Sequence, residues 1–138
     1  MTGAVFGDDR FCFVCGEENP EGLRLSPRGE DGRGFISWTP SRRFQGFSGI
    51  LHGGIVSALM DEAMAYAAMS VSGSDAAATA TITVSFHRPV STDRPLTVEA
   101  RVVEHRGRII GTEASMLQDG DVMASATARF LSVPSSGG

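Results

Sequence analysis

Two adjacent carboxylates, Asp61 and Glu62, interrupt a long apolar stretch of the chain. Burying a carboxylate without a partner costs several kcal/mol, so buried carboxylates concentrate at sites where their chemistry is used. In such a place a carboxylate can serve as a general base or as a nucleophile. The structural alternative is that Glu62 reaches water or an arginine at a subunit contact, while Asp61 caps a neighbouring loop.

His52-Gly53-Gly54 comes shortly before the two acids. Glycines in the first turn of a helix leave backbone N–H groups unobstructed at the positive end of the helix dipole, where a developing oxyanion can be stabilised. Asp61 follows Gly53 by about two helical turns and therefore lies on nearly the same face. Gly53, Ser57, Asp61 and Ala65 would form a line of small residues against which a substrate could lie. Alternatively, the glycines only permit a tight join between loop and helix.

The stretch from about Gly53 to Val71 is predicted to form the helix that positions these residues. It consists largely of good helix formers and is apolar on nearly every face. A helix that is apolar all round is expected to be buried all round. Gly73-Ser74 is predicted to end it.

Alternating apolar and polar residues predict strands on both sides of this helix. Before it, a short strand is expected at Leu23–Leu25 and a longer one at Gly34–Trp38, with a hairpin turn at Gly29–Gly32. After it, β-rich runs cover residues 78–87, 96–104, 108–117 and 122–133. The turns Arg106-Gly107 and Asp119-Gly120 lie in short connections, which indicates antiparallel hairpins.

One long helix and about six mainly antiparallel strands predict an α+β domain in which a curved sheet wraps around the helix. Such a sheet leaves its outer face and its edges uncovered. We therefore expect a second copy of the chain to pair with it.

Length, charge and composition exclude several classes of protein. A chain of 138 residues fits one domain. The net charge is −4 and no basic run exceeds Arg42-Arg43, so the basic surface of a nucleic-acid-binding protein is missing. All twelve basic residues are arginines, which excludes Schiff-base and P-loop lysine chemistry. We expect no signal peptide and no membrane span, which would need ~20 apolar residues, and a location in the cytoplasm.

Cys12 and Cys15 have the spacing of a zinc knuckle. A closed zinc site needs about four ligands, and the only histidines, His52, His87 and His105, are distant in sequence. A redox Cys-x-x-Cys pair would have a strand before it and a helix after it, whereas Asn19-Pro20 follows here. We therefore expect no metal, and two structurally buried thiols.

Three segments resemble a known family. Leu51-His52-Gly53-Gly54-Ile55-Val56-Ser57-Ala58-Leu59-Met60-Asp61-Glu62-Ala63-Met64 looks like the central-helix signature of the hotdog-fold acyl-CoA thioesterases of the phenylacetate-pathway (PaaI-like) and 4-hydroxybenzoyl-CoA type. The run Cys12–Gly16 together with Asn19–Leu23 is similar to a subgroup of that family, and Phe86–Val90 resembles the end of its first strand after the helix. The resemblance implies a hotdog domain at 22–133; turn residues predict a turn-rich segment at 1–21 before it, and Pro134-Ser135-Ser136-Gly137-Gly138 predicts a frayed tail at 134–138.

The resemblance also implies roles for single residues. Asp61 matches the family's catalytic acid, a nucleophile or general base toward the thioester carbonyl, and Gly53 matches the glycine whose N–H polarises that carbonyl. His52 matches a residue near the thioester. Thr79 falls where relatives place a hydroxyl that positions water, with Thr81 and Thr83 nearby.

Further residues are candidates for binding the substrate. Gly54, Ser57 and Glu62 belong to the same helix, and Arg88, Arg106 and Arg108 are candidates for the phosphates of coenzyme A, against the alternative of solvated surface arginines.

The function implied is hydrolysis of an acyl-CoA thioester to a carboxylate and free coenzyme A. Coenzyme A would enter only as part of the substrate, with no other cofactor. In family members the acid and the glycine can come from opposite subunits, so a dimer or tetramer is expected, with the active site at the subunit interface. Two alternatives stay open: a hotdog dehydratase or hydratase acting on hydroxyacyl thioesters, and a non-catalytic acyl-CoA-binding module.

Overall fold

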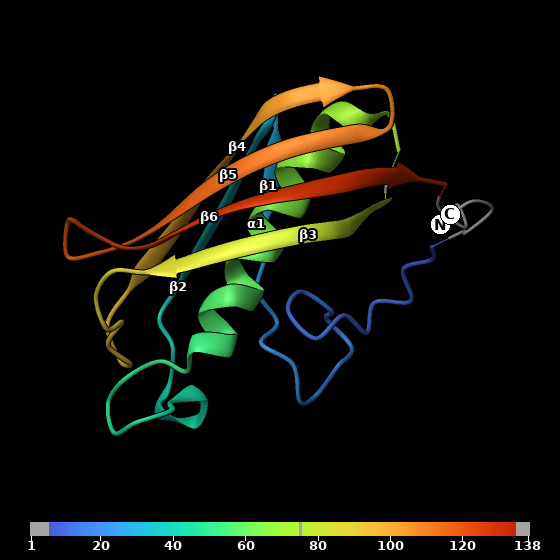
Figure 1. The fold of residues 1–138 in the computed structure, drawn as a ribbon. Helices are drawn as coiled ribbons and strands as arrows, with labels where there is room; N and C mark the ends of the chain where they lie inside the picture. The colour runs from blue at the N-terminus through green and yellow to red at the C-terminus, as the bar shows by residue number, and fades with distance from the viewer. Residues whose placement is uncertain (1–5, 75, 135–138) are drawn as a thin grey trace.

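A single 20-residue helix, α1 (Gly53–Ser72), crosses one face of a six-stranded antiparallel sheet (Figure 1). The computed structural model describes residues 6–74 and 76–134. In chain order the elements are β1 (Arg28–Glu30), β2 (Arg33–Trp38), a 3-10 turn at Arg42–Phe44, α1, β3 (Ala76–Phe86), β4 (Leu96–Arg106), β5 (Ile109–Gln118) and β6 (Asp121–Val133). The strands lie in the order β1-β2-β4-β5-β6-β3, and all neighbours are antiparallel. The predicted α+β architecture is confirmed.

Helix α1 begins and ends close to the predicted positions, but its burial differs from the prediction. Its buried side chains face the sheet, and they are Val56, Leu59, Met60, Ala63, Met64, Ala67 and Ala68. On another face Ser57, Asp61 and Ala65 remain only half-buried. The expectation of burial all round is wrong for the single chain, because one sheet can cover only one side of a helix.

Glycines in β1 and β2 let these strands approach the α1 backbone closely. A Cβ atom on Gly34 would lie 2.0 Å from the carbonyl oxygen of Ala63, and one on Gly29 would lie 2.5 Å from that of Tyr66. Only residues without a side chain fit there. The small residues of strand and helix therefore set how closely the helix sits against this end of the sheet.

The prediction of a strand at Leu23–Leu25 is wrong, because these residues belong to none of the six strands. Both leucines are buried and Arg24 between them is exposed, as the alternation predicts. However, the segment forms only two backbone bonds with its neighbour, from Leu23 N–H to Phe13 O and from Leu25 N–H to Val14 O. Arg24 has a positive φ of 54°, which interrupts an extended strand. The first strand lies later, at Arg28–Glu30.

The predicted hairpins at Arg106-Gly107 and Asp119-Gly120 are confirmed, whereas the first turn is shorter than predicted, because Gly29 and Glu30 belong to β1. Asp31-Gly32 and Asp119-Gly120 join β1 to β2 and β5 to β6, and all four residues have positive φ. Two-residue turns of this kind match the twist of antiparallel strands. The pairing leaves β3 with one partner strand, β6, so its other edge is open in the described part of the chain.

The N-terminal segment, residues 6–22, lies against the side of α1 that carries Glu62 and Tyr66, where Cys12 and Cys15 contact these two side chains. Val14 from this segment joins the same hydrophobic core as Leu23 and Leu25. Phe6 N–H donates to the carbonyl of Pro134 at 2.9 Å. The rest of the predicted tail at 134–138 lies outside the described residues. Within residues 6–74 and 76–134 no helix is long and apolar enough to cross a membrane.

Candidate active site

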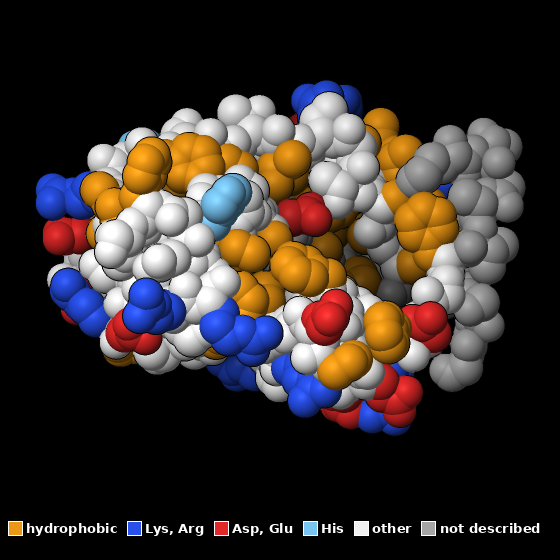
Figure 2. Space-filling model, turned by 90° about the horizontal axis from the view of Figure 1, so that it is seen from below, with side chains coloured by type: hydrophobic (Ala, Val, Ile, Leu, Met, Phe, Trp, Pro, Cys, Tyr) orange, Lys and Arg blue, Asp and Glu red, His pale blue; other side chains and the backbone are white. Residues whose placement is uncertain are grey.

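An apolar pocket of about 590 Å³ opens at the start of α1. Figure 2 views the molecule from the end at which the helix begins and shows hydrophobic side chains gathered in a hollow. The pocket is formed by the loop before α1, the first turn of the helix and the segment after β3. Its lining residues are Gly46, Phe47, Ile50, Leu51, His52, Gly53, Val56, Phe86, His87, Arg88, Pro89 and Val90.

The first helical turn presents one backbone donor to this pocket. His52 caps the helix, and its Nδ1 accepts the N–H of Gly54 at 2.9 Å. The N–H groups of Ile55 and Val56 both bond to the carbonyl of His52. The Gly53 N–H has no acceptor among the described residues, as is usual for a first helical position. Of the predicted glycine donors, Gly53 is therefore free and Gly54 is occupied.

Asp61 and Thr79 form a second group, farther along the helix. The Thr79 hydroxyl donates to Asp61 Oδ1 at 2.7 Å. A β-bulge between Thr79 and Thr81 shifts the register of β3 against β6, so these two threonines, which would share a face in a regular strand, pair with residues on opposite faces of β6. Thr79 lies opposite the buried Phe130, whereas Thr81 lies opposite the exposed Arg129. Of the three nearby threonines, the structure brings Thr79 to the acid.

The two groups are separated along the helix. Gly53 and Asp61 are eight positions apart, which corresponds to about 12 Å of rise. Ser57 lies between them, and its hydroxyl donates to the Gly53 carbonyl at 3.0 Å. A single carbonyl group cannot contact both the Gly53 N–H and the Asp61 carboxylate of one chain across this distance.

The three candidate arginines are not brought together. Arg88 lines the pocket and forms an exposed ion pair with Asp121 at 3.8 Å. Arg106 and Arg108 belong to the β4–β5 hairpin, where Ile109 pairs with Leu131 at the end of the sheet away from Phe86. Only Arg88 can serve this pocket within one chain.

Glu62 faces away from the pocket and meets the N-terminal segment. Its Oε2 lies 4.0 Å from the Cys12 sulfur, and the Cys15 sulfur lies within 4.8 Å of a Glu62 carboxylate oxygen. The Tyr66 hydroxyl donates to Cys15 Sγ at 3.6 Å. Burial raises the pKa of Glu62, with smaller contributions from the negative charges of Asp61 and Asp8. Burial likewise raises the pKa of the Cys15 thiol, and the nearby Glu62 carboxylate adds to this effect.

A second hollow, of about 500 Å³, lies on the outer face of the sheet. Arg101 and Glu113 form an ion pair in it, and serine and threonine side chains supply much of the remaining lining. None of the predicted site residues lines it.

Sequence reasoning missed the aromatic part of the pocket. Phe47 is 85% exposed at the pocket, and the Phe86 ring lies 3.5 Å from where a Cβ on Gly53 would be. An exposed phenylalanine within a polar, glycine-containing loop is a signal that could have marked Phe47. No local signal pairs Phe86 with Gly53, since the two lie on different elements.

Residues 48–125 match the Thioesterase superfamily. No curated protein sequence matches the chain. Among solved structures, the chain is similar to RHA08564, a thioesterase superfamily protein, with 30% sequence identity and a TM-score of 0.77. The match covers 88% of this chain but only 63% of the length of RHA08564.

Two further solved structures share the fold at lower identity. The PaaI protein of the E. coli phenylacetic acid degradation operon has 22% identity and a TM-score of 0.69, over 75% of this chain and 74% of that one. The protein smu.793 of Streptococcus mutans UA159, bound to acetyl CoA, has 15% identity and a TM-score of 0.73, over 80% and 89%. The long helix against a curved antiparallel sheet is the hotdog arrangement.

Proposed function

This chain belongs to the Thioesterase superfamily, and on that basis we propose that it hydrolyses an acyl-CoA thioester to a carboxylate and free coenzyme A. The observation that carries the proposal is the unpartnered Gly53 N–H at the wall of an apolar pocket. The Asp61–Thr79 pair supplies the acid–base group that such a donor needs. The fold relative smu.793 binds acetyl CoA, which supports a coenzyme A ester as the substrate.

Each group has a role in this reaction. The Gly53 N–H donates to the thioester carbonyl and stabilises the oxyanion that forms on it, while the helix dipole adds to the effect. Asp61 either removes a proton from water, whose hydroxide adds to the carbonyl carbon, or attacks that carbon directly. The carbon–sulfur bond then breaks and coenzyme A leaves with a proton. On the direct-attack route this leaves a mixed anhydride between the acyl group and Asp61, which a water molecule then hydrolyses to the carboxylate product and free Asp61. Thr79 holds the Asp61 carboxylate and a water molecule in place.

The substrate's two halves meet different surfaces. The apolar pocket, with Phe47 and Phe86, suits a medium-chain or aryl acyl group, and Arg88 at its wall suits a phosphate of coenzyme A. Glu62 is not included among the substrate contacts, because its carboxylate lies against the cysteine-containing turn and not in the pocket. We propose no cofactor beyond the coenzyme A of the substrate.

We further propose that the complete site forms between two copies of the chain. Within one chain Gly53 and Asp61 are about 12 Å apart along the helix, too far to act on one carbonyl. Strand β3 connects the two groups, since Thr79 near one end contacts Asp61 and Phe86 at the other end lies against Gly53. Antiparallel pairing of two open β3 edges would set the Thr79 end of one chain beside the Phe86 end of the other. Each acid would then face the helix start of the partner.

The first experiment measures thiol release from short, medium, long and aryl acyl-CoAs by the wild-type chain and by Asp61→Asn. Release that collapses in the variant supports the hydrolase and its acid. Equal background from both would refute catalysis and favour the acyl-CoA-binding module. A single turnover in ¹⁸O-water tests the nucleophile role, because label in the Asp61 carboxylate can arise only when water attacks the Asp61 carbon of the anhydride.

The Gly53 donor can be tested with a matched pair of variants. Gly53 is the first helical residue, where proline is tolerated, and His52 before it has φ −60° and ψ 134°, a conformation compatible with a following proline. Gly53→Pro deletes the N–H, whereas Gly53→Ala keeps it and meets no atom nearer than 3.5 Å. We expect roughly a hundredfold to thousandfold loss of kcat in the proline variant alone, the usual cost of removing one oxyanion donor. Full activity of Gly53→Pro would refute the role.

Mixed dimers test the shared site. A heterodimer of Asp61→Asn and Gly53→Pro chains would have one site with both groups intact and one with neither. Co-expression should therefore restore about a quarter of the wild-type sites, as expected for random pairing in a two-fold dimer. No recovery in purified, stable heterodimers would show that the groups do not combine across chains.

A further inference from the structure

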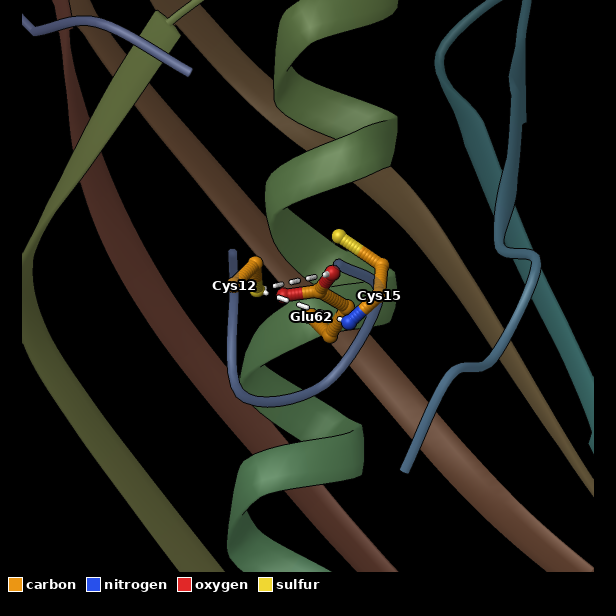
Figure 3. Close-up of side chains that lie close together, drawn as sticks. All are labelled: Cys12, Cys15 and Glu62. Carbon is orange, nitrogen blue, oxygen red and sulfur yellow. Dashed lines mark hydrogen bonds between the residues drawn. The ribbon is translucent and has the colours of Figure 1, made fainter. Parts of the chain in front are cut away.

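Cys12, Cys15 and Glu62 form a compact group of potential metal ligands on the face of α1 that the N-terminal segment covers (Figure 3). One ligand atom from each residue lies within 4.8 Å of the other two. In a tetrahedral zinc site, sulfur at ~2.3 Å and oxygen at ~2.0–2.2 Å from the ion would lie about 3.5–3.8 Å apart. The ligands therefore need to move together by about 1 Å or less.

The backbone around Cys12 is already shaped for a thiolate. The N–H groups of Val14 and Cys15 both donate to Cys12 Sγ, at 3.4 and 3.5 Å. Hydrogen bonds to an ionised sulfur are stronger than bonds to a thiol, so two such donors favour the ligand form. A Cβ on Gly16 would lie 2.2 Å from the Cys12 nitrogen, so only glycine can close this turn. The turn is thus held in shape by its own backbone.

Glu62 lacks the cation that a half-buried carboxylate normally requires. No arginine or histidine forms an ion pair with it in residues 6–74 and 76–134. Its near neighbours are instead the two sulfurs and, through Cys15, the Tyr66 hydroxyl. A bound cation would provide the missing positive charge.

The donor set indicates which cation. Two thiolates and one carboxylate suit Zn²⁺, whereas Mg²⁺ and Ca²⁺ prefer oxygen ligands alone. The fourth position of a tetrahedron is available to water or to the Tyr66 oxygen, which lies 3.6 Å from Cys15 Sγ.

We propose that Cys12, Cys15 and Glu62 bind one zinc ion that fixes the N-terminal segment to the middle of α1. When zinc binds, each thiol loses its S–H proton to solvent, and each sulfur forms a bond to the ion instead. The ion's role is structural, because it joins a turn to the helix on the face away from the pocket. The prediction of no metal considered only histidines as ligands beside the two cysteines. The third ligand proposed here is Glu62, which lies 47 residues after Cys15.

The test is the metal content of the 138-residue chain, purified without an affinity tag and dialysed against metal-free buffer. We expect one zinc per chain in the wild type, and loss of zinc in Cys12→Ser, Cys15→Ser and Glu62→Gln. Glu17→Gln is the matched control, because Glu17 lies just beyond the turn and pairs with Arg10. This variant should keep its zinc.

Cobalt provides a second readout on the wild-type chain, so the test does not depend on variants that fold. Reconstitution with Co²⁺ should produce thiolate-to-cobalt charge-transfer absorption and intense tetrahedral bands. Two titratable thiols without metal, or a mass lowered by two hydrogens through a Cys12–Cys15 disulfide, would overturn the proposal. Full zinc content in a folded Glu62→Gln variant would overturn the assignment of the third ligand.

Discussion

Replacing Thr79 by valine removes one hydroxyl and preserves the shape of a β-branched side chain on β3. The hydroxyl donates to Asp61 Oδ1 at 2.7 Å, a short bond to a charged acceptor. Hydrogen bonds to charged groups are worth about 1.5–3 kcal/mol, and each ~1.4 kcal/mol of transition-state stabilisation is a factor of ten in rate. Thr79 is exposed in the single chain, so water can partly replace it. We therefore expect the lower end of this range, roughly a tenfold fall in kcat/KM for thiol release.

Two controls make this prediction specific. Thr79→Ser keeps the donor and should retain most activity, and Thr81→Val makes the same change on the far side of the bulge and should have no effect. In an Asp61→Asn background, Thr79→Val should cost little more, because the two residues act as a pair. Equal rates for Thr79→Val and wild type, or equal losses from Thr79→Val and Thr81→Val, would refute the reasoning.

Three further predictions concern stability and specificity. Gly34→Ala places a methyl group 2.0 Å from the Ala63 carbonyl oxygen and should destabilise the fold by about 3 kcal/mol, the upper end for overpacking. The midpoint of urea unfolding measures this loss of stability. The control is Gly46→Ala, whose methyl group meets nothing nearer than 3.5 Å, and an equal shift of the midpoint in both variants would contradict the prediction. His52→Ala removes the helix cap and should cost about 1 kcal/mol, which His52→Asn should largely restore. Equal urea midpoints for these two variants would argue against capping. Phe47→Ser should raise KM for aryl and medium-chain acyl-CoAs more than for acetyl-CoA, with little change in stability, because the side chain is exposed at the pocket; a uniform change in KM would mean that Phe47 does not contact the acyl group.

Much of the fold could be predicted because its signals are local. The composition of residues 53–71 identifies the helix, and turn pairs such as Asp119-Gly120 identify hairpins through their positive φ angles. Alternation located the four strands after the helix to within about two residues of their ends. Alternation failed at Leu23–Leu25, because it reports which side chains are buried and not whether a backbone ladder forms.

The candidate site was predicted only in part. Residue types and spacing selected Gly53 and Asp61, since a glycine-rich helix start and an acid in an apolar helix are visible in one segment. Neither the occupied N–H of Gly54 nor the cysteine contacts of Glu62 could be foreseen. Those contacts depend on the rotamer of a capping side chain and on a turn 50 residues away from Glu62.

The helix and the hairpins could be read from the chain alone, because they follow from interactions among near neighbours in the sequence. Which residues meet at the site depends instead on how distant segments pack. With the register shift after Thr79, that threonine, and not Thr81, meets Asp61 of α1, 18 residues earlier in the chain. The length of the same helix keeps Gly53 and Asp61 apart. Such distances depend on how helix and sheet pack against each other, and periodicity along one segment carries no information about that packing.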